Sequence, residues 1–336
     1  MLSKDYKKVR EELDNCTRPI YFFHDDADGL CSFLLFYKYK QEGKGIPVKA
    51  RPIIDSKFLK IVREYEPDKI FVLDVAIVTQ EFIDAVKVPV IIVDHHEVLD
   101  LNNVIYLNPR RYKQFFPASY LCYKVVNQNM WLATIGCIGD WFIPDFAKEF
   151  QKKYPKLLTN INSPGDALFD TEVGKLSEIL SFSLKGKTHE VNKVIKVLTR
   201  VNDPNELLEN KTTQANFVIK RYTKIKQDYM NLLKQVKPTK DKIIFFTYPS
   251  DKMSFTGELS NELLHKYPDK VIIIAREKSG EMKCSLRSAK IEILPILKTA
   301  LMGVDGYGGG HEYAAGACIK KYDFDTFLEN LRNEID

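Results

Sequence analysis

At 336 residues, with 45% hydrophobic and 28% charged residues, the chain has the composition of an ordinary globular protein and is long enough for two domains. A net charge of +5 does not by itself indicate nucleic acid, and no apolar run approaches the roughly 18 residues of a membrane span, so we expect a cytoplasmic protein without a membrane partner. The six cysteines form no Cys-x-x-Cys pair, which predicts reduced core thiols and excludes a zinc-finger or disulfide framework.

Short apolar runs alternate with amphipathic segments through the first half of the sequence. We predict strands near residues 19–23, 47–53, 70–74 and 89–94, separated by helices near 30–39, 57–65 and 79–87. The apolar run 133–139 is interpreted as one more buried strand. This alternation with short connections predicts an α/β fold, with a parallel sheet covered on both faces.

The pattern of the second half predicts a helical segment followed by a smaller mixed unit. Helices are expected at 172–184 and 190–201, then strands at 243–247, 271–275 and 282–286, with helices at 257–264 and 324–331. We therefore predict an N-terminal parallel-sheet domain with a helical extension (1–210), a linker helix (211–240) and a C-terminal α/β domain (241–336).

The predicted linker helix is strongly basic. Between Lys211 and Lys242 there are nine basic residues and two acidic ones. Apolar residues recur at helical spacing in the same stretch, at Phe217, Ile225, Tyr229, Leu232 and Leu233. Two interpretations stay open, a solvated linker or a track for a phosphate backbone.

Acidic residues and histidines follow the predicted strands at the point where each strand ends. They are His24, Asp26 and Asp28, then Asp74, then Asp94, His95 and His96, and finally Asp140. One such aspartate is usually a helix cap, and one such histidine usually belongs to the core. Because carboxyl ends of parallel strands meet at one edge of a sheet, however, these acids would repel one another unless a cation offset their charge. The set therefore predicts a metal site.

These motifs, in this order, resemble those of the DHH phosphoesterases. The matching segments are His24-x-Asp26-x-Asp28-Gly29, Asp74, Asp94-His95-His96 and Gly136-x-x-Gly139-Asp140, with Asn108-Pro109 and Pro117-Ala118-Ser119 also similar. Gly308-Gly309-Gly310-His311 followed by Ala314-Ala315-Gly316 resembles the DHH-associated substrate-binding domain. The resemblance implies a catalytic N-terminal domain and a substrate-binding C-terminal domain.

The resemblance also implies a role for each site residue. Two Mn²⁺ ions are expected, with Mg²⁺ or Co²⁺ as alternatives. The implied ligands are Asp26, Asp74 and His24 for one ion, and Asp28, Asp74, His95 and Asp140 for the other. His96 would face the scissile phosphate and Asp94 would orient an imidazole. In the second domain, Gly309, Gly310 and His311 would hold the terminal nucleotide, in an anion-binding turn, while Arg287 contacts a phosphate.

The implied function is hydrolysis of phosphodiester bonds by two-metal catalysis. The favoured activity is that of a RecJ-like exonuclease or a nanoRNase, which releases nucleoside monophosphates from single-stranded RNA or DNA or from short oligonucleotides. A phosphoesterase acting on a cyclic or linear dinucleotide or a nucleotide 3′-phosphate is an alternative, and an inorganic pyrophosphatase is disfavoured by the 308–316 motif. A non-catalytic replication scaffold is another alternative, against which the complete ligand set argues. A homodimer and a replication or repair partner both stay open.

Overall fold

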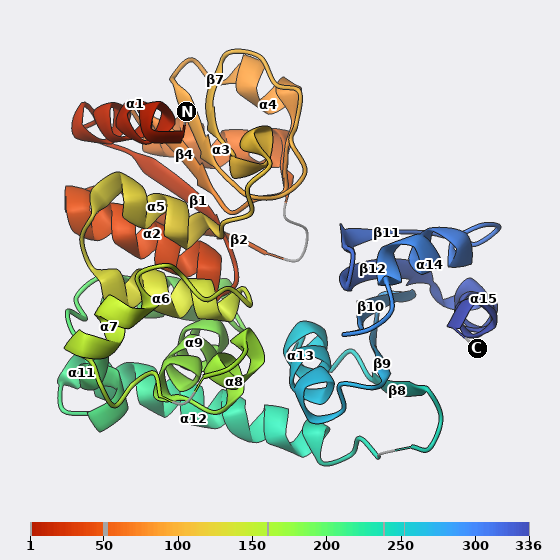
Figure 1. The fold of residues 1–336 in the computed structure, drawn as a ribbon. Helices are drawn as coiled ribbons and strands as arrows, with labels where there is room; N and C mark the ends of the chain where they lie inside the picture. Colours follow the sequence, from red (N-terminus) through yellow and green to blue (C-terminus); the bar gives the residue numbers. More distant parts are fainter. Residues whose placement is uncertain (1, 50–52, 160, 238, 252, 336) are drawn as a thin grey trace. The chain divides into compact units, whose positions relative to one another are not determined.

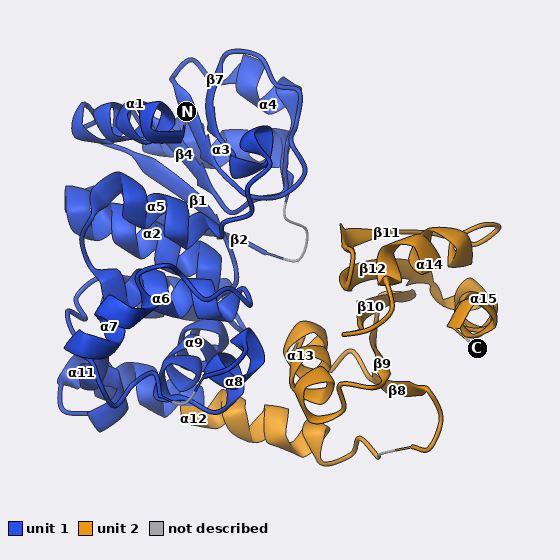
Figure 2. Ribbon diagram, in the orientation of Figure 1, with its two compact units in different colours: residues 1–222 blue, residues 223–336 orange. Residues whose placement is uncertain are grey.

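The computed structural model describes residues 2–49, 53–159, 161–237, 239–251 and 253–335 (Figure 1). The chain divides into two compact units, Met1–Tyr222 and Thr223–Asp336, which are taken one at a time below (Figure 2). Among the described residues, none of the helices combines the length and the apolar character that crossing a bilayer requires.

Unit 1 begins with alternating strands and helices and ends in a run of helices. Its elements are α1 (Leu2–Asp14), β1 (Ile20–His24), α2 (Ala27–Lys40), β2 (Lys44–Val48), β3 (Ile53–Ile54), α3 (Leu59–Tyr65), β4 (Ile70–Leu73), β5 (Ile77–Val78), α4 (Gln80–Ala85), β6 (Val90–Val93), β7 (Val104–Leu107), α5 (Ala118–Val126), α6 (Met130–Gly139), α7 (Ala147–Lys153), α8 (Pro164–Phe169), α9 (Glu172–Ser183), α10 (Thr188–Leu198), α11 (Pro204–Glu209) and α12 (Thr213–Leu233), which continues into unit 2.

Five of these strands form one parallel sheet in the order β2-β1-β4-β6-β7. Successive residues of each strand face opposite sides: Tyr21 and Phe23 pack with α2 and α5, whereas Ile20 and Phe22 pack with α3 and α4 (Figure 1). The chain passes from β1 to one neighbour, β2, and then crosses to the other, β4. The carboxyl ends of β1 and β4 therefore border the point where the strand order reverses, which is where open α/β sheets bind ligands.

The structure confirms most of the elements predicted for this half, corrects two of them and adds two that were not predicted. The strand expected at 47–53 is two shorter strands, β2 and β3, and residues 50–52 of that prediction lie outside the described residues. The expectation of a strand at 133–139 is wrong, because this run lies in helix α6. Helix α1 and strand β7 were not predicted from any sequence pattern, although their side chains complete the core beside the sheet.

Helix α6 was mistaken for a strand because it is apolar on all sides, and a short, wholly buried run does not show a period. Two glycines let it lie against its neighbours. A Cβ at Gly136 would come 2.5 Å from Ser119 Oγ of α5, and one at Gly139 would come 2.8 Å from Ala27 Cβ of α2. The close approach brings Asp140, which follows α6, to the sheet edge.

Helix α12 departs from the expected amphipathic pattern at two positions. Ile225, Tyr229 and Leu232 are buried as expected, but Phe217 is 45% exposed. Arg221 does not belong to an exposed basic face, because it donates to the carbonyls of Ser183 and Lys185 and to Glu190. These contacts fix the end of α9 within unit 1.

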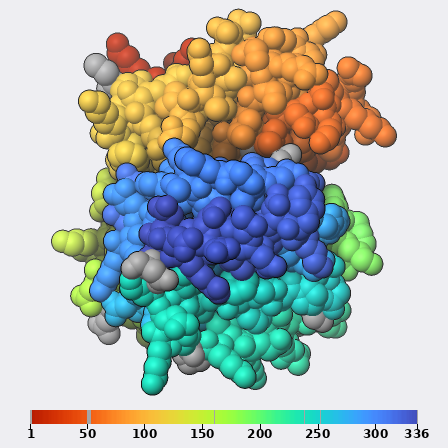
Figure 3. All heavy atoms as spheres, turned by 90° about the vertical axis from the view of Figure 1, so that its right-hand side faces the viewer, coloured from red at the N-terminus to blue at the C-terminus, as the bar shows by residue number. Residues whose placement is uncertain are grey.

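Unit 2 has a second sheet in the order β11-β12-β10-β9-β8, in which only β8 and β9 run parallel. Its elements are β8 (Ile243–Tyr248), α13 (Thr256–Lys266), β9 (Val271–Lys278), β10 (Glu281–Arg287), α14 (Ile293–Ala300), β11 (Gly306–His311), β12 (Ala314–Lys320) and α15 (Phe324–Ile335). Helices α14 and α15 form with this sheet a separate core that includes Phe327 and Leu331, and the C-terminal residues of the unit are dark blue in Figure 3.

The glycine run 308–310 is not the turn that the sequence predicted. It forms most of the edge strand β11, paired along its length with β12. The alanines and glycine at 314–316 lie in that neighbouring strand, and a Cβ at Gly308 would come 2.9 Å from the carbonyl oxygen of Gly316. The exposed edge of this sheet is therefore the glycine-rich strand β11, which packs closely on the small residues of β12.

Candidate metal centre

The acidic clusters meet at the carboxyl edge of the parallel sheet in unit 1. His24 ends β1, and Asp26 caps α2, where its side chain accepts a hydrogen bond from Gly29 N. Asp28 lies in the first turn of that helix. Asp74 follows β4, the histidine pair follows β6, and Asp140 follows helix α6 in place of the expected strand.

Asp74 lies at the centre of the cluster, and its two carboxylate oxygens face different neighbours. Oδ2 is 3.5 Å from His24 Nδ1, which in turn lies 2.7 Å from Asp26 Oδ2. Oδ1 is 3.2 Å from His95 Nε2 and 4.0 Å from His96 Nδ1. One buried carboxylate is therefore shared by two groups of ligand atoms.

The backbone at Asp74 is unusual. Its φ of 58° lies in the left-handed region, which residues other than glycine adopt only rarely, aspartate more often than most. Its amide donates to Val93 O at 2.9 Å, so the turn after β4 is tied to the end of β6. Strain of this kind persists where the surroundings hold it, commonly at functional sites.

A third group of ligand atoms forms around Asp28 and Asp140. His95 Nδ1 is 3.6 Å from Asp140 Oδ2. Asp28 is buried and accepts hydrogen bonds from Ala118 N at 2.8 Å, from Ser119 N at 3.0 Å and from the Ser119 hydroxyl. Each carboxylate oxygen has two lone pairs, so these bonds fix the orientation of Asp28 and still leave it able to bind a cation.

Asp94 points at a neighbouring histidine. One oxygen lies 2.8 Å from His96 Nδ1 and the other accepts the His96 amide at 3.0 Å. The backbone of the pair is held from the other side, where Asn108 Nδ2 donates to His96 O and Arg110 Nε donates to His95 O. A carboxylate on Nδ1 favours the ring tautomer with its proton there, which directs the Nε2 lone pair outward.

Burial and neighbouring charges shift the pKa values of the acids strongly. Burial raises the pKa of Asp28 well above its usual range, and the charges of Asp74 and Asp140 raise it further. Burial also raises the pKa of Asp140 to about 6, against the opposing charge of His95. For Asp74 burial acts upward too, but the contacts with His24 and His95 outweigh it and lower the pKa.

The two histidines respond to the same acids. Burial lowers the pKa of His24, but Asp26 and Asp74 outweigh this and hold it well above its ordinary value. For His95, the carboxylates of Asp140, Asp74 and Asp28 likewise outweigh burial and raise the pKa. Protons on the imidazoles thus balance the acids when no cation does.

The cluster fits divalent metal ions. Its ligand atoms form three groups, each within 4.8 Å: His24, Asp26 and Asp74; Asp74, His95 and His96; Asp28, His95 and Asp140. Carboxylate oxygens with a few imidazoles suit Mn²⁺ or Mg²⁺. Within the described residues, the buried Asp74 Oδ1 accepts no hydrogen bond of good geometry, as expected of an atom that serves a cation.

Two family models match the sequence: "DHH family, N-terminal domain" over residues 20–140 and "DHHA1 domain" over residues 241–336. The chain therefore contains a DHH domain followed by a DHHA1 domain. Every residue of the metal cluster lies within the DHH match, and the glycine-rich strand lies within the DHHA1 match.

Solved structures share the fold of the chain. RecJ from Thermus thermophilus in complex with Mn²⁺ matches with a TM-score of 0.70 at 15% identity, over 99% of this chain but only 54% of RecJ. The DHH domain of a protein from a family of ribosomal proteins gives the same score and identity, over 99% and 91% of the two chains. A pGpG-specific phosphodiesterase from Vibrio cholerae matches at 0.51 and 14%, over 95% and 99%. No curated protein matches the sequence.

The residues expected to bind substrate in the DHHA1 domain lie in one row across its sheet. Arg287 of β10 is opposite Ala314 of β12, and Ala314 is opposite His311 of β11. Arg287 Nε donates to Asn261 Oδ1 at 2.8 Å and Nη1 donates to Ala315 O at 3.1 Å, so its guanidinium is held in place. Gly309 and Gly310 lie beside His311 on the exposed strand.

Sequence reasoning missed the residues that support the DHH cluster. Ser119 and Asn108 were noticed only as similar to the family, although they hold Asp28 and the His96 backbone. Arg110, which binds the His95 carbonyl, was not singled out at all. Their position in the chain could have indicated them, because all three lie in or beside the connection from β7 to α5, directly after the last strand of the sheet.

Proposed function

We propose that this chain is a metal-dependent phosphodiesterase that removes nucleoside monophosphates from the end of a short single strand, with Mn²⁺ as its preferred ion. The observation that carries the proposal is the position of Asp74, whose two oxygens serve two adjacent groups of ligand atoms. One shared carboxylate suits a pair of ions acting on a single phosphate.

In this proposal the ligands divide between two ions. His24 and Asp26 would hold one, Asp28, His95 and Asp140 would hold the other, and Asp74 would contribute to both. Bound ions supply a water nucleophile at neutral pH and neutralise the charge that develops on the phosphoryl group. Ser119 and the amide of Ala118 keep Asp28 oriented, so that side of the site is set before any substrate binds.

His96 is the residue that we assign to the substrate. With Nδ1 held by Asp94, Nε2 is the ring nitrogen that is left to contact a phosphate group of the substrate. Asp94 acts through His96 as a positioning residue, since both its oxygens are engaged by that histidine.

A dinucleotide phosphodiesterase is the second candidate for the same site. The pGpG-specific phosphodiesterase aligns over 99% of its own length and 95% of this chain. This match supports substrates of a few nucleotides as a second possibility. Both candidates use the same metal ligands and differ in substrate length.

The test is digestion of end-labelled single strands of RNA and DNA, from dinucleotides to about 30 nucleotides, with and without Mn²⁺. Stepwise release of mononucleotides from the longer strands supports the exonuclease, and cleavage confined to dinucleotides supports the second candidate. The control is His95→Ala, which removes a ligand and should abolish cleavage and reduce the bound Mn²⁺ measured by elemental analysis. If the intact protein cleaves none of these substrates, the proposal is wrong and a scaffold role gains support.

A further inference from the structure

The connection from β7 to α5 is tied at both ends to the metal cluster. Its first residues contact the histidine pair, because Asn108 donates to His96 O at 3.0 Å and Arg110 Nε donates to His95 O at 2.8 Å. Its last residues lead into Ala118 and Ser119, whose amides bind Asp28. We call residues 109–116 the bridging segment.

Two neighbouring aromatic residues of the bridging segment point to different places. Phe116 turns inward, where its ring stacks on Tyr120 with 4.4 Å between centroids and meets Phe142 edge-on at 5.9 Å. Phe115 turns outward and is 66% exposed, which is unusual for a phenylalanine. The guanidinium of Arg110 lies 5.2 Å from the Phe115 ring centroid. The residue that binds the His95 carbonyl therefore also supports the exposed ring.

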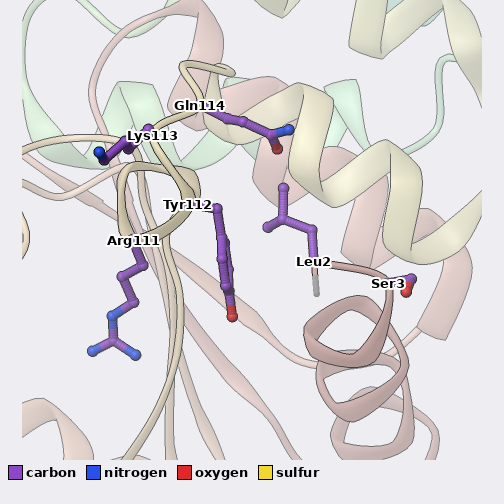
Figure 4. Close-up of a pocket in the computed structure, with 6 residues that line it drawn as sticks. All are labelled: Leu2, Ser3, Arg111, Tyr112, Lys113 and Gln114. Carbon is purple, nitrogen blue, oxygen red and sulfur yellow. The ribbon is translucent and has the colours of Figure 1, made fainter.

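The bridging segment is not a loose loop. Lys113 N donates to Arg110 O at 3.0 Å and Gln114 N donates to Pro109 O at 3.1 Å, which closes a compact turn. Behind it, the Tyr112 hydroxyl donates to Asp5 of α1 at 2.6 Å. A shallow hollow of about 580 Å³ lies there between Leu2 and the turn (Figure 4). Phe115 is thus presented from a fixed backbone, and an exposed ring held in this way loses little entropy on binding.

The charge around Phe115 suits an anionic ligand. The bridging segment carries Arg110, Arg111 and Lys113 and no aspartate or glutamate, and Arg110 Nη1 also pairs with Glu97 at 3.4 Å. An aromatic face flanked by cations is the combination that binds single-stranded nucleic acid, because the cations attract phosphates and every base can stack. Inorganic polyphosphate has no base that could stack on the ring.

We propose that Phe115 stacks on a nucleobase of the substrate whose phosphate occupies the metal cluster. This rests on the proposed function and deepens it, because it makes a nucleotide, and not an inorganic phosphate ester, the substrate class. Stacking is tolerant of sequence, so the platform would accept any base with modest preferences. Phe116, packed inward, anchors the platform without touching the base.

The binding test uses a Phe115→Trp variant and the probes 5′-AMP and ribose 5-phosphate, which differ only in the base, both with Mg²⁺ present. We expect AMP to change the variant's tryptophan fluorescence saturably, and ribose 5-phosphate to leave it unchanged. The wild type reports any contribution from Trp131 and Trp141, which is subtracted. An equal response to both probes, or no response to AMP, overturns the inference whether or not the protein is an active phosphodiesterase.

The kinetic test compares Phe115→Ala, Phe115→Tyr and Gln114→Ala on a dinucleotide. Loss of one stacked base should raise KM on the order of tenfold in Phe115→Ala, with kcat nearly unchanged, and Tyr should restore the wild-type KM. Gln114→Ala, a change at the exposed neighbour, should leave KM unchanged. An active wild type whose KM is unaffected by Phe115→Ala overturns the inference alone. An inactive wild type overturns the proposed function, and the fluorescence result then decides the inference.

Discussion

At the scale of single residues, the centre depends on how Asp74 is held. Its backbone has a φ of 58°, and its amide bonds the end of β6, so the carboxylate is placed where the two strand ends meet. This backbone conformation lets the carboxylate of Asp74 face both groups of ligand atoms. An aspartate with ordinary backbone angles would direct its oxygens elsewhere.

Asp94→Asn tests the role of the carboxylate behind His96. An asparagine keeps the shape but has only one acceptor oxygen, so it cannot accept from both Nδ1 and the backbone amide of His96 and no longer holds the ring in place. We expect kcat to fall by roughly 10 to 100 fold. Because Asp94 has both oxygens on His96, bound Mn²⁺ should stay at the wild-type level. A variant that loses its metal would show instead that Asp94 is a ligand.

At the scale of elements, the predictable strands are the ones whose residues are apolar on both faces. Strands β1, β4 and β6 are runs of four or five residues rich in β-branched and aromatic side chains, too short for a helix, and the acids that follow them mark the candidate site in the sequence. Helix α6 is equally apolar, so the sequence pattern does not distinguish a helix from a strand there. The close packing of Gly136 and Gly139 against neighbouring helices cannot be recognised from the local sequence. Ser119 and Arg110 escaped for the same reason, because their partners are 91 and 15 residues away in the sequence.

Gly136→Ala tests the close contact between α6 and α5. The new Cβ would come 2.5 Å from Ser119 Oγ and 3.0 Å from Cys31 Cβ, so the helices must shift. We expect the free energy of unfolding to fall by about 1 to 3 kcal/mol and Mn²⁺ to bind less tightly, since Ser119 orients Asp28. Gly257→Ala is the matched control, because nothing lies within 4 Å of its Cβ and alanine favours a helix. Equal effects of the two changes in urea unfolding would contradict the packing argument.

The basic residues of helix α12 have different environments: Arg221 is bound to other parts of unit 1, whereas two lysines are exposed. Arg221 and Lys49 donate to carbonyls around the end of α9, so Arg221→Ala should lower the free energy of unfolding by about 1 to 3 kcal/mol.

Lys220 and Lys224 of α12 are exposed. If the helix guides a phosphate backbone, replacing both by alanine should weaken binding to a long single strand and flatten its salt dependence, without changing stability. Binding curves of the wild type and the double variant that coincide at every salt concentration would leave α12 as a linker.

At the scale of the whole molecule, each unit has a core of its own. The metal cluster and both tryptophans, Trp131 and Trp141, lie in unit 1, whereas the core around Phe327 belongs to unit 2. Tryptophan fluorescence therefore reports the unfolding of the metal-binding unit alone. Circular dichroism reports both units, because each contains helices.

Mn²⁺ should raise the unfolding temperature seen by fluorescence, because an ion that binds only the folded unit stabilises it by about 2.7 kcal/mol at 100 times its Kd. The increase should be large at pH 8 and small at pH 5. Burial raises the pKa of Asp140 to about 6, so below that pH the ion must displace a proton from a ligand.

In the metal-free protein the stability depends on pH in the opposite direction. A carboxyl with a raised pKa in the folded state stabilises the fold most at low pH, and this contribution is lost as pH rises through about 6. Melting curves at both pH values, with and without Mn²⁺, separate the two effects. Asp140→Asn should remove the pH dependence of the Mn²⁺ shift that this carboxyl causes, and a shift that is equal at pH 5 and pH 8 in the wild type would contradict its role as a ligand.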